Sequence, residues 1–155
     1  MAGEATNSAL GILWGGLIAG MMDITAAILT WKIKANAPPI RVLQGVASGW
    51  TGRDAAIAGG WRTAMLGLAF HFLIAFTATT VFYLASRKIG FLLSNVWAAG
   101  VLYGIAVYGF MYWVVVPLSN VTRRPFSWEV TITAIITHIV CVGLPIALSV
   151  KKFSR

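Results

Sequence analysis

Four side chains that can exchange protons or donate hydrogen bonds interrupt the apolar stretches of this chain. They are Asp23, His71, Tyr108 and His138, and each lies in a different apolar stretch. An ionised carboxylate near the bilayer centre costs about 2.5 to 3.5 kcal/mol on insertion scales, so Asp23 must be neutral, paired or in contact with water. A histidine titrates between pH 5 and 8, and a phenol donates a hydrogen bond. Together, such groups suit proton movement or the binding of a small solute.

The spacing of these four residues predicts that they lie in one layer. Each is about eight to ten residues from the end of its apolar stretch, and these ends belong to the same membrane face. Because a helix rises about 1.5 Å per residue, the layer should lie roughly 12 to 15 Å deep. In this hypothesis Asp23 holds or exchanges the proton, His71 and His138 relay it, and Tyr108 donates a hydrogen bond.

Glycine pairs indicate which helix faces should meet. The predicted helix-packing residues are Gly16, Gly20, Gly100 and Gly104. One Gly-x-x-x-Gly pair shares a helical stripe with Asp23 and the other with Tyr108, so both polar groups should face neighbouring helices. Each pair is followed, one span later, by a histidine. This match predicts two helical hairpins related by an axis along the membrane normal.

Composition places these residues in a membrane protein. The chain has 155 residues, of which 59% are hydrophobic and 10% are charged, whereas soluble domains average about 25% charged residues. Four stretches reach the roughly 20 residues that a spanning helix needs: 10–31, 62–85, 96–118 and 128–150. We therefore predict an all-α fold, a bundle of four transmembrane helices in a single domain over residues 1–155. The short connection after residue 85 predicts that the second and third spans are antiparallel neighbours.

A short segment between the first two spans has the pattern of an interfacial helix. It covers about residues 39–50, after Pro38 and Pro39 prevent the first helix from continuing. Its apolar residues fall on one side and Arg41, Gln44 and Ser48 on the other, as in a helix that lies on the membrane surface. Thr51 and Asp54 have the spacing of a capping box, which predicts that another helix begins there.

Charge and motifs restrict the function classes. The formal net charge is +8, but Lys and Arg lie almost wholly at span ends, where they contact lipid headgroups, so the lipid bilayer and not nucleic acid is the expected partner. The single cysteine, Cys141, has no partner in the chain. No phosphate-binding glycine loop, HExxH or CxxC motif occurs, and no serine has an evident base beside it. We predict no catalytic residues, no enzyme activity, and no metal or other cofactor.

Several interpretations of the polar layer stay open. The four groups could satisfy one another and only fix helix register. They could form a proton relay or a solute site. His71 and His138 could instead hold a b-type haem, the low-probability cofactor alternative, or join Asp23 in a metal site. Finally, the small-residue stripes could pack against a second copy of this chain itself or against other membrane-protein subunits, as in an accessory subunit of a larger complex.

Several short motifs resemble the YagU-like family of small bacterial inner-membrane proteins of unknown function. These are GLIAG at residues 16–20, AFHFLIAF around His71, the third helix with Gly100 and Gly104 and its VPLS exit at 116–119, and the His138 helix that ends in basic residues. The similarity extends over most of the chain, except 38–60. It implies four helices and a multi-pass location in the bacterial inner (plasma) membrane, and it brings no catalytic residues.

Overall fold

The fold consists of helices that run between two membrane faces. The computed structural model describes residues 2–122 and 125–154, and within them it contains helices and no strand. The elements are α1 (Ala2–Ala35), α2 (Pro39–Thr51), α3 (Arg53–Ala58), α4 (Gly60–Ser86), α5 (Phe91–Ser94), α6 (Val96–Phe110), η1 (Met111–Val115), α7 (Val116–Leu118), α8 (Trp128–Thr137), η2 (His138–Gly143) and α9 (Leu144–Phe153). Four helices are long and apolar enough to cross a membrane: Asn7–Ala35, Gly60–Ser86, Val96–Leu118 and Trp128–Phe153. The predicted all-α membrane fold is confirmed, and the first span is longer than predicted at both ends.

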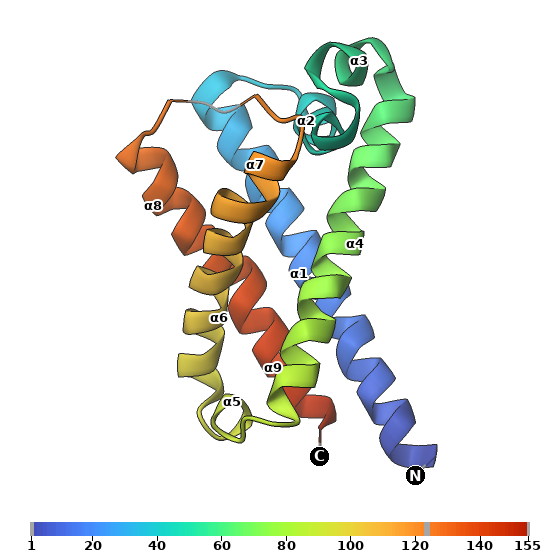
Figure 1. Ribbon diagram of the computed structural model, residues 1–155, viewed down its shortest axis with the longest axis vertical. Coiled ribbons are helices and arrows are strands. Elements are labelled where there is room, and N and C mark those ends of the chain that lie inside the picture. Colours follow the sequence, from blue (N-terminus) through green and yellow to red (C-terminus); the bar gives the residue numbers. More distant parts are fainter. Residues whose placement is uncertain (1, 123–124, 155) are drawn as a thin grey trace.

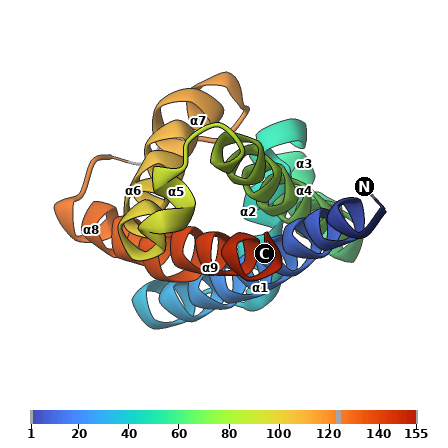
Figure 2. The ribbon, with the colours of Figure 1, turned by 90° about the horizontal axis from the view of Figure 1, so that it is seen from below.

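The four spans form a bundle that is closed at one end by α2 and α3. Both termini lie at the lower end in Figure 1, which we call the terminal face, while α2 and α3 cover the upper end, the α2–α3 face. α1 packs against α4 and α9, and α6 packs against η2 and α9. Seen along the bundle in Figure 2, the four spans surround a central space. Each span therefore presents one side to the interior and another to the outside.

The second and third spans, α4 and α6, meet mainly through Tyr103. Its hydroxyl donates a hydrogen bond to the carbonyl oxygen of Ala78 at 2.6 Å, and its ring centroid lies 5.0 Å from that of Phe82. The sequence predicted these spans as antiparallel neighbours. They run antiparallel, but α6 makes its close backbone contacts with η2 and α9 instead. The reason is that its glycines lie on the side of α6 that faces η2.

Glycines allow α6 and η2 to touch through their backbones. A Cβ atom on Gly143 would overlap the carbonyl oxygen of Gly100 and the backbone of Gly104. A Cβ atom on Gly104 would lie 2.6 Å from the carbonyl oxygen of His138, much closer than real contacts permit. Only glycine fits at such a crossing.

The first hairpin, formed by α1 and α4, also has glycines where its two helices approach closely. Gly20 lies against the ring of Phe72, which a Cβ atom would approach to 2.6 Å, and Gly16 lies against the ring of Phe76. In both hairpins, then, the glycine pair of the first helix contacts the histidine-bearing span that follows it.

Two π-helical segments, which the sequence analysis did not predict, interrupt the spans. η1 lies just before Pro117 and η2 just before Pro145. A proline has no N–H to donate, and its ring clashes with the carbonyl four residues earlier. Widening the preceding turn to a π-helix relieves this conflict. His138 is the first residue of η2, so Pro145 influences where that histidine lies.

The interfacial helix α2 is present, and hydrogen bonds fasten it to the bundle. Gln44 Nε2 donates to the carbonyl oxygen of Gly60 at 2.9 Å, and the backbone N–H of Asn120 donates to the carbonyl oxygen of Gly49 at 2.9 Å. Gln44 is only 3% exposed, because the polar side of α2 turns toward α3 and the start of α4. The apolar side turns toward the bundle interior.

The predicted capping box at Thr51 and Asp54 was wrong. The residue before α3 is Gly52, with φ of 79°, and no side chain caps that helix. The Thr51 hydroxyl instead donates toward the carbonyl oxygen of Ala47 at 3.2 Å, in the last turn of α2. A positive φ favours glycine, so the helix junction is placed at Gly52 and Thr51 completes α2.

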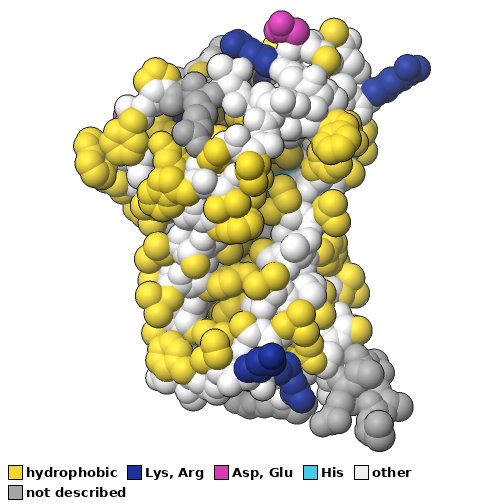
Figure 3. Space-filling view, in the orientation of Figure 1, with side chains coloured by type: hydrophobic (Ala, Val, Ile, Leu, Met, Phe, Trp, Pro, Cys, Tyr) yellow, Lys and Arg dark blue, Asp and Glu magenta, His cyan; other side chains and the backbone are white. Residues whose placement is uncertain are grey.

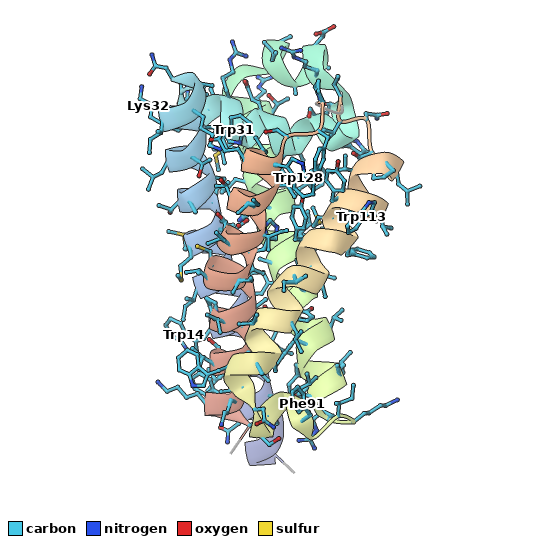
Figure 4. The ribbon with its side chains drawn as sticks, turned by 90° about the vertical axis from the view of Figure 1, so that its left-hand side faces the viewer. Trp14, Trp31, Lys32, Phe91, Trp113 and Trp128 are labelled. Atoms are coloured by element: carbon cyan, nitrogen blue, oxygen red, sulfur yellow. The ribbon has the colours of Figure 1, made fainter. Side chains whose placement is uncertain are left out.

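The outer surface has the distribution expected of a bilayer-embedded protein. Figure 3 shows hydrophobic side chains along the flank, Lys and Arg at the two ends, and Asp or Glu only near the upper end. In Figure 4, Trp31, Trp113 and Trp128 lie toward one end and Trp14 toward the other. Tryptophans are enriched at the two membrane interfaces, so these residues mark the boundaries of the apolar band.

Candidate functional site

All four predicted polar residues line one cavity of about 300 Å³ inside the bundle. Asp23 comes from α1, His71 from α4, Tyr108 from α6 and His138 from η2. The lining includes Val42 and Val46 of α2, so the cavity lies at the end of the bundle that α2 covers. The remaining lining is mostly apolar: Ala19, Gly20, Ile24, Ala27, Val42, Val46, Ile74, Ala75, Ala78, Val107, Met111, Tyr112, Val116 and Val142.

The α2 helix closes the cavity toward the α2–α3 face. Val42 and Val46 line the cavity from α2, and the hydrogen bonds of Gln44 and Asn120 hold the helix in place. α2 therefore does more than lie on the membrane, since its apolar side forms one wall of the candidate site.

Asp23 is the only acid lining this cavity among the described residues, and no Lys or Arg lines it. The side chain is half-buried, and no hydrogen bond or ion pair holds its carboxylate in the described part of the chain. The titratable groups on the surrounding elements are His71, Tyr108, Tyr112, His138 and Cys141. Lys34, which shares the second cavity with Asp23, is paired with Glu129, so a cation or a proton from outside could balance the charge of Asp23.

A second cavity, of about 200 Å³, connects this carboxylate with the α2–α3 face. Asp23, Ala27 and His138 line both cavities, and the second one extends along α1 and α8 to Trp31 and Lys34. Near its outer end Lys34 Nζ lies 2.8 Å from Glu129 Oε1. Asp23 and His138 thus lie where the two cavities meet, and the second cavity extends from them toward the α2–α3 face.

His71 ties α4 to α1. Its Nε2 lies 2.9 Å from the carbonyl oxygen of Gly20. Because a carbonyl can only accept, Nε2 carries the hydrogen in this arrangement, and Nδ1 is the nitrogen left for other contacts. The glycine makes room for this bond by leaving the α1 backbone uncovered.

His138 uses the opposite ring nitrogen. Its Nδ1 donates to the carbonyl oxygen of Ala134 at 2.8 Å, within its own helix. This leaves Nε2 as an acceptor next to the cavity. The ring of Tyr108 meets the imidazole at 5.6 Å between centroids, with an interplanar angle of 73°.

Tyr112 belongs to the same wall and was missed by the sequence analysis. Its ring stacks on that of Tyr108, with centroids 5.8 Å apart and planes 20° apart. Tyr112 follows Tyr108 by four residues, the spacing that puts two side chains on one helix face. That spacing is the signal in the sequence from which Tyr112 could have been placed beside Tyr108.

The histidine geometry bears on the haem and metal alternatives. Haem iron commonly takes a histidine nitrogen as axial ligand, but in His71 the Nε2 atom is already hydrogen-bonded to Gly20. Bis-histidine ligation would require this bond between α1 and α4 to break. Within residues 2–122 and 125–154, no group of three His, Cys, Asp or Glu side chains is placed to hold a metal ion.

Comparisons with known proteins add no relative. No protein-family model matches the chain, and neither do the curated proteins or the solved structures that were compared. The resemblance to YagU-like proteins therefore stays a prediction, and the functional argument rests on the cavity.

Proposed function

We propose that this membrane protein moves protons across the bilayer, with Asp23 as the group that binds the proton and, in its place, a small solute. The observation that carries the proposal is the position of Asp23, where the inner cavity meets the cavity that leads to the α2–α3 face. Ionisable groups inside membrane proteins mark ion pathways and proton relays. A carboxylate without a partner has a reason to persist there only if something else binds to it.

The other polar residues receive distinct roles in this proposal. His138 offers an acceptor nitrogen beside Asp23 and lines both cavities, so it relays protons. His71 is engaged with Gly20, and its role is to hold α1 and α4 together. Tyr108 forms part of the solute-binding wall. The proposal needs no catalytic residue.

A flux measurement in vesicles tests this function. The purified protein is reconstituted with a pH-sensitive dye inside, and a pH gradient is imposed while valinomycin and potassium clamp the voltage. We expect Asp23→Asn to reduce proton flux to the level of empty vesicles, because the amide cannot carry the proton. Asp54→Asn, which alters an exposed carboxylate on α3, is the matched control and should keep the flux. Undiminished flux in Asp23→Asn would overturn the proposal.

An accessory role in a larger membrane complex is a second candidate. It is supported by the third span, because only 6% of its apolar window is buried within the bundle, compared with 22 to 28% in the other spans. This span has the most surface left for a foreign helix. Purification in a mild detergent tests the idea, since an accessory role predicts a companion protein that co-purifies in a fixed ratio and is lost when Ile105, exposed on α6, is replaced by Trp.

A further inference from the structure

The solute of the inner cavity can be assigned a chemical class. Resting on the proposed function, we propose that the cavity binds a monovalent organic ammonium ion, with its charge between Asp23 and the rings of Tyr108 and Tyr112. Three features of the cavity favour such an ion: its charge, its aromatic wall and the apolar side chains of the remaining lining.

The charge of the lining selects a cation. Asp23 is the only acid and no Lys or Arg lines the cavity within the described residues, so an ionised Asp23 gives the site one negative charge. A bound anion would be repelled, and a neutral solute would leave the carboxylate unpaired inside the membrane. A monovalent cation neutralises the site completely.

The aromatic wall provides a second interaction for the same charge. Tyr108 and Tyr112 stack at 5.8 Å and both line the cavity with Asp23. A cation within about 6 Å of a ring centroid is attracted by the negative face of the ring, most strongly where water is excluded. Ammonium ions with alkyl substituents use this contact because they bring little hydration of their own.

The remaining lining excludes hydrated inorganic ions. Ca²⁺ takes about six to eight oxygen ligands, and Mg²⁺ keeps several waters. The side chains here provide one carboxylate, two phenol oxygens and two imidazoles, fewer oxygen ligands than these divalent ions take, with alanine, valine, isoleucine and methionine around them. Alkyl groups gain free energy in such surroundings. A cavity of about 300 Å³ accommodates a cation of the size of tetraethylammonium.

Binding should release a proton when Asp23 is protonated. The carboxylic acid gives its proton to water, and the ammonium ion then pairs with the carboxylate, so one positive charge replaces another. The other titratable groups that share a cavity with Asp23 or interact with it are His71, His138, Cys141, the two tyrosines and Lys34, which is paired with Glu129.

Equilibrium binding of radiolabelled tetraethylammonium to the purified full-length protein tests this inference. We expect saturable binding at pH 8. Asp23→Asn should weaken it at least about tenfold, and Asp54→Asn should leave it unchanged. Tyr108→Leu should weaken binding by about 2- to 30-fold, whereas Tyr108→Phe, which keeps the ring, should bind like the natural protein. Each variant is first checked for a monodisperse peak in size-exclusion chromatography.

The outcomes separate this inference from the proposed function. No binding of tetraethylammonium by the natural protein, or equal binding by Asp23→Asn, would overturn the organic-cation site even if proton flux still depends on Asp23. Equal losses in Tyr108→Phe and Tyr108→Leu would also overturn it, because they would assign the contact to the hydroxyl. Binding that follows the expected variant order without any proton flux would support the site and refute transport.

Discussion

At the scale of single residues, His71 and His138 differ in what their hydrogen bonds connect. The His71 bond joins α4 to the backbone of α1 across the bundle. The His138 bond stays within one helix, and Ala134 also accepts the backbone N–H of His138. The two histidines look alike in the sequence, but only the first one links two spans. This difference predicts different effects of their removal.

We expect His71→Ala to reduce stability by about 0.5 to 1.5 kcal/mol, because hydrogen bonds between membrane helices contribute on this scale. His138→Ala should reduce stability less but should slow proton flux more. Denaturation of the detergent-solubilised protein and the vesicle assay measure the two effects. A larger loss of stability in His138→Ala than in His71→Ala would contradict the assignment of His71 as the residue that links the two spans.

At the scale of elements, the crossing of α6 and η2 depends on backbone contact. Gly143 faces the backbone of Gly100 and Gly104, so an added Cβ has no space, and neither helix can move without opening the cavity wall. The crossing also fixes the side of η2 on which His138 lies. Pro145 contributes by widening the turn before it. The geometry of the candidate site is therefore sensitive to a position that does not line it.

Gly143→Ala tests this crossing. It should destabilise the fold by about 1 to 3 kcal/mol or more, the usual cost of overpacking. Gly45→Ala is the matched control, because a Cβ atom there would meet nothing within 4 Å and the change removes flexibility from the unfolded chain. Thermal unfolding of both variants in the same detergent is the measurement. Similar stabilities of Gly143→Ala and Gly45→Ala would contradict this prediction, because they would show that α6 and η2 can separate at little cost.

At the scale of the whole molecule, four spans place both termini on the same side of the membrane. α2 and α3 lie together at the opposite face (Figure 1). The second cavity opens toward that face. Access to Asp23 from water should therefore differ between the two sides of the membrane.

Single cysteines test this topology in a Cys141→Ala background. Lys88→Cys and Ser154→Cys should react with a membrane-impermeant maleimide from one side, and Asp54→Cys from the other, because Lys88 and Ser154 lie at the terminal face and Asp54 lies on α3. Intact and opened vesicles of known orientation provide the comparison. Labelling of the Lys88→Cys and Asp54→Cys variants from the same side would rule out four spans.

The sequence determined the fold class and predicted one layer for the four polar residues, all of which line a single cavity in the structure. Long apolar runs must become helices in lipid, since every backbone polar group needs an internal partner, and counting residues along a helix gives depth directly. The interfacial helix was also predictable, because Pro38 and Pro39 end the first span and the next residues are amphipathic. The functional roles of Asp23, His71, Tyr108 and His138 stay predictions.

Only the tertiary structure decided how these residues meet. The two π-helical turns, the wall formed by α2 and the meeting of two cavities at Asp23 and His138 depend on how helices distant in the sequence pack. Helical spacing gives the side of each helix on which a residue lies, but not which neighbour covers that side. Tertiary packing makes that choice here, because glycine contacts such as that of Gly143 on Gly104 set which helices approach most closely.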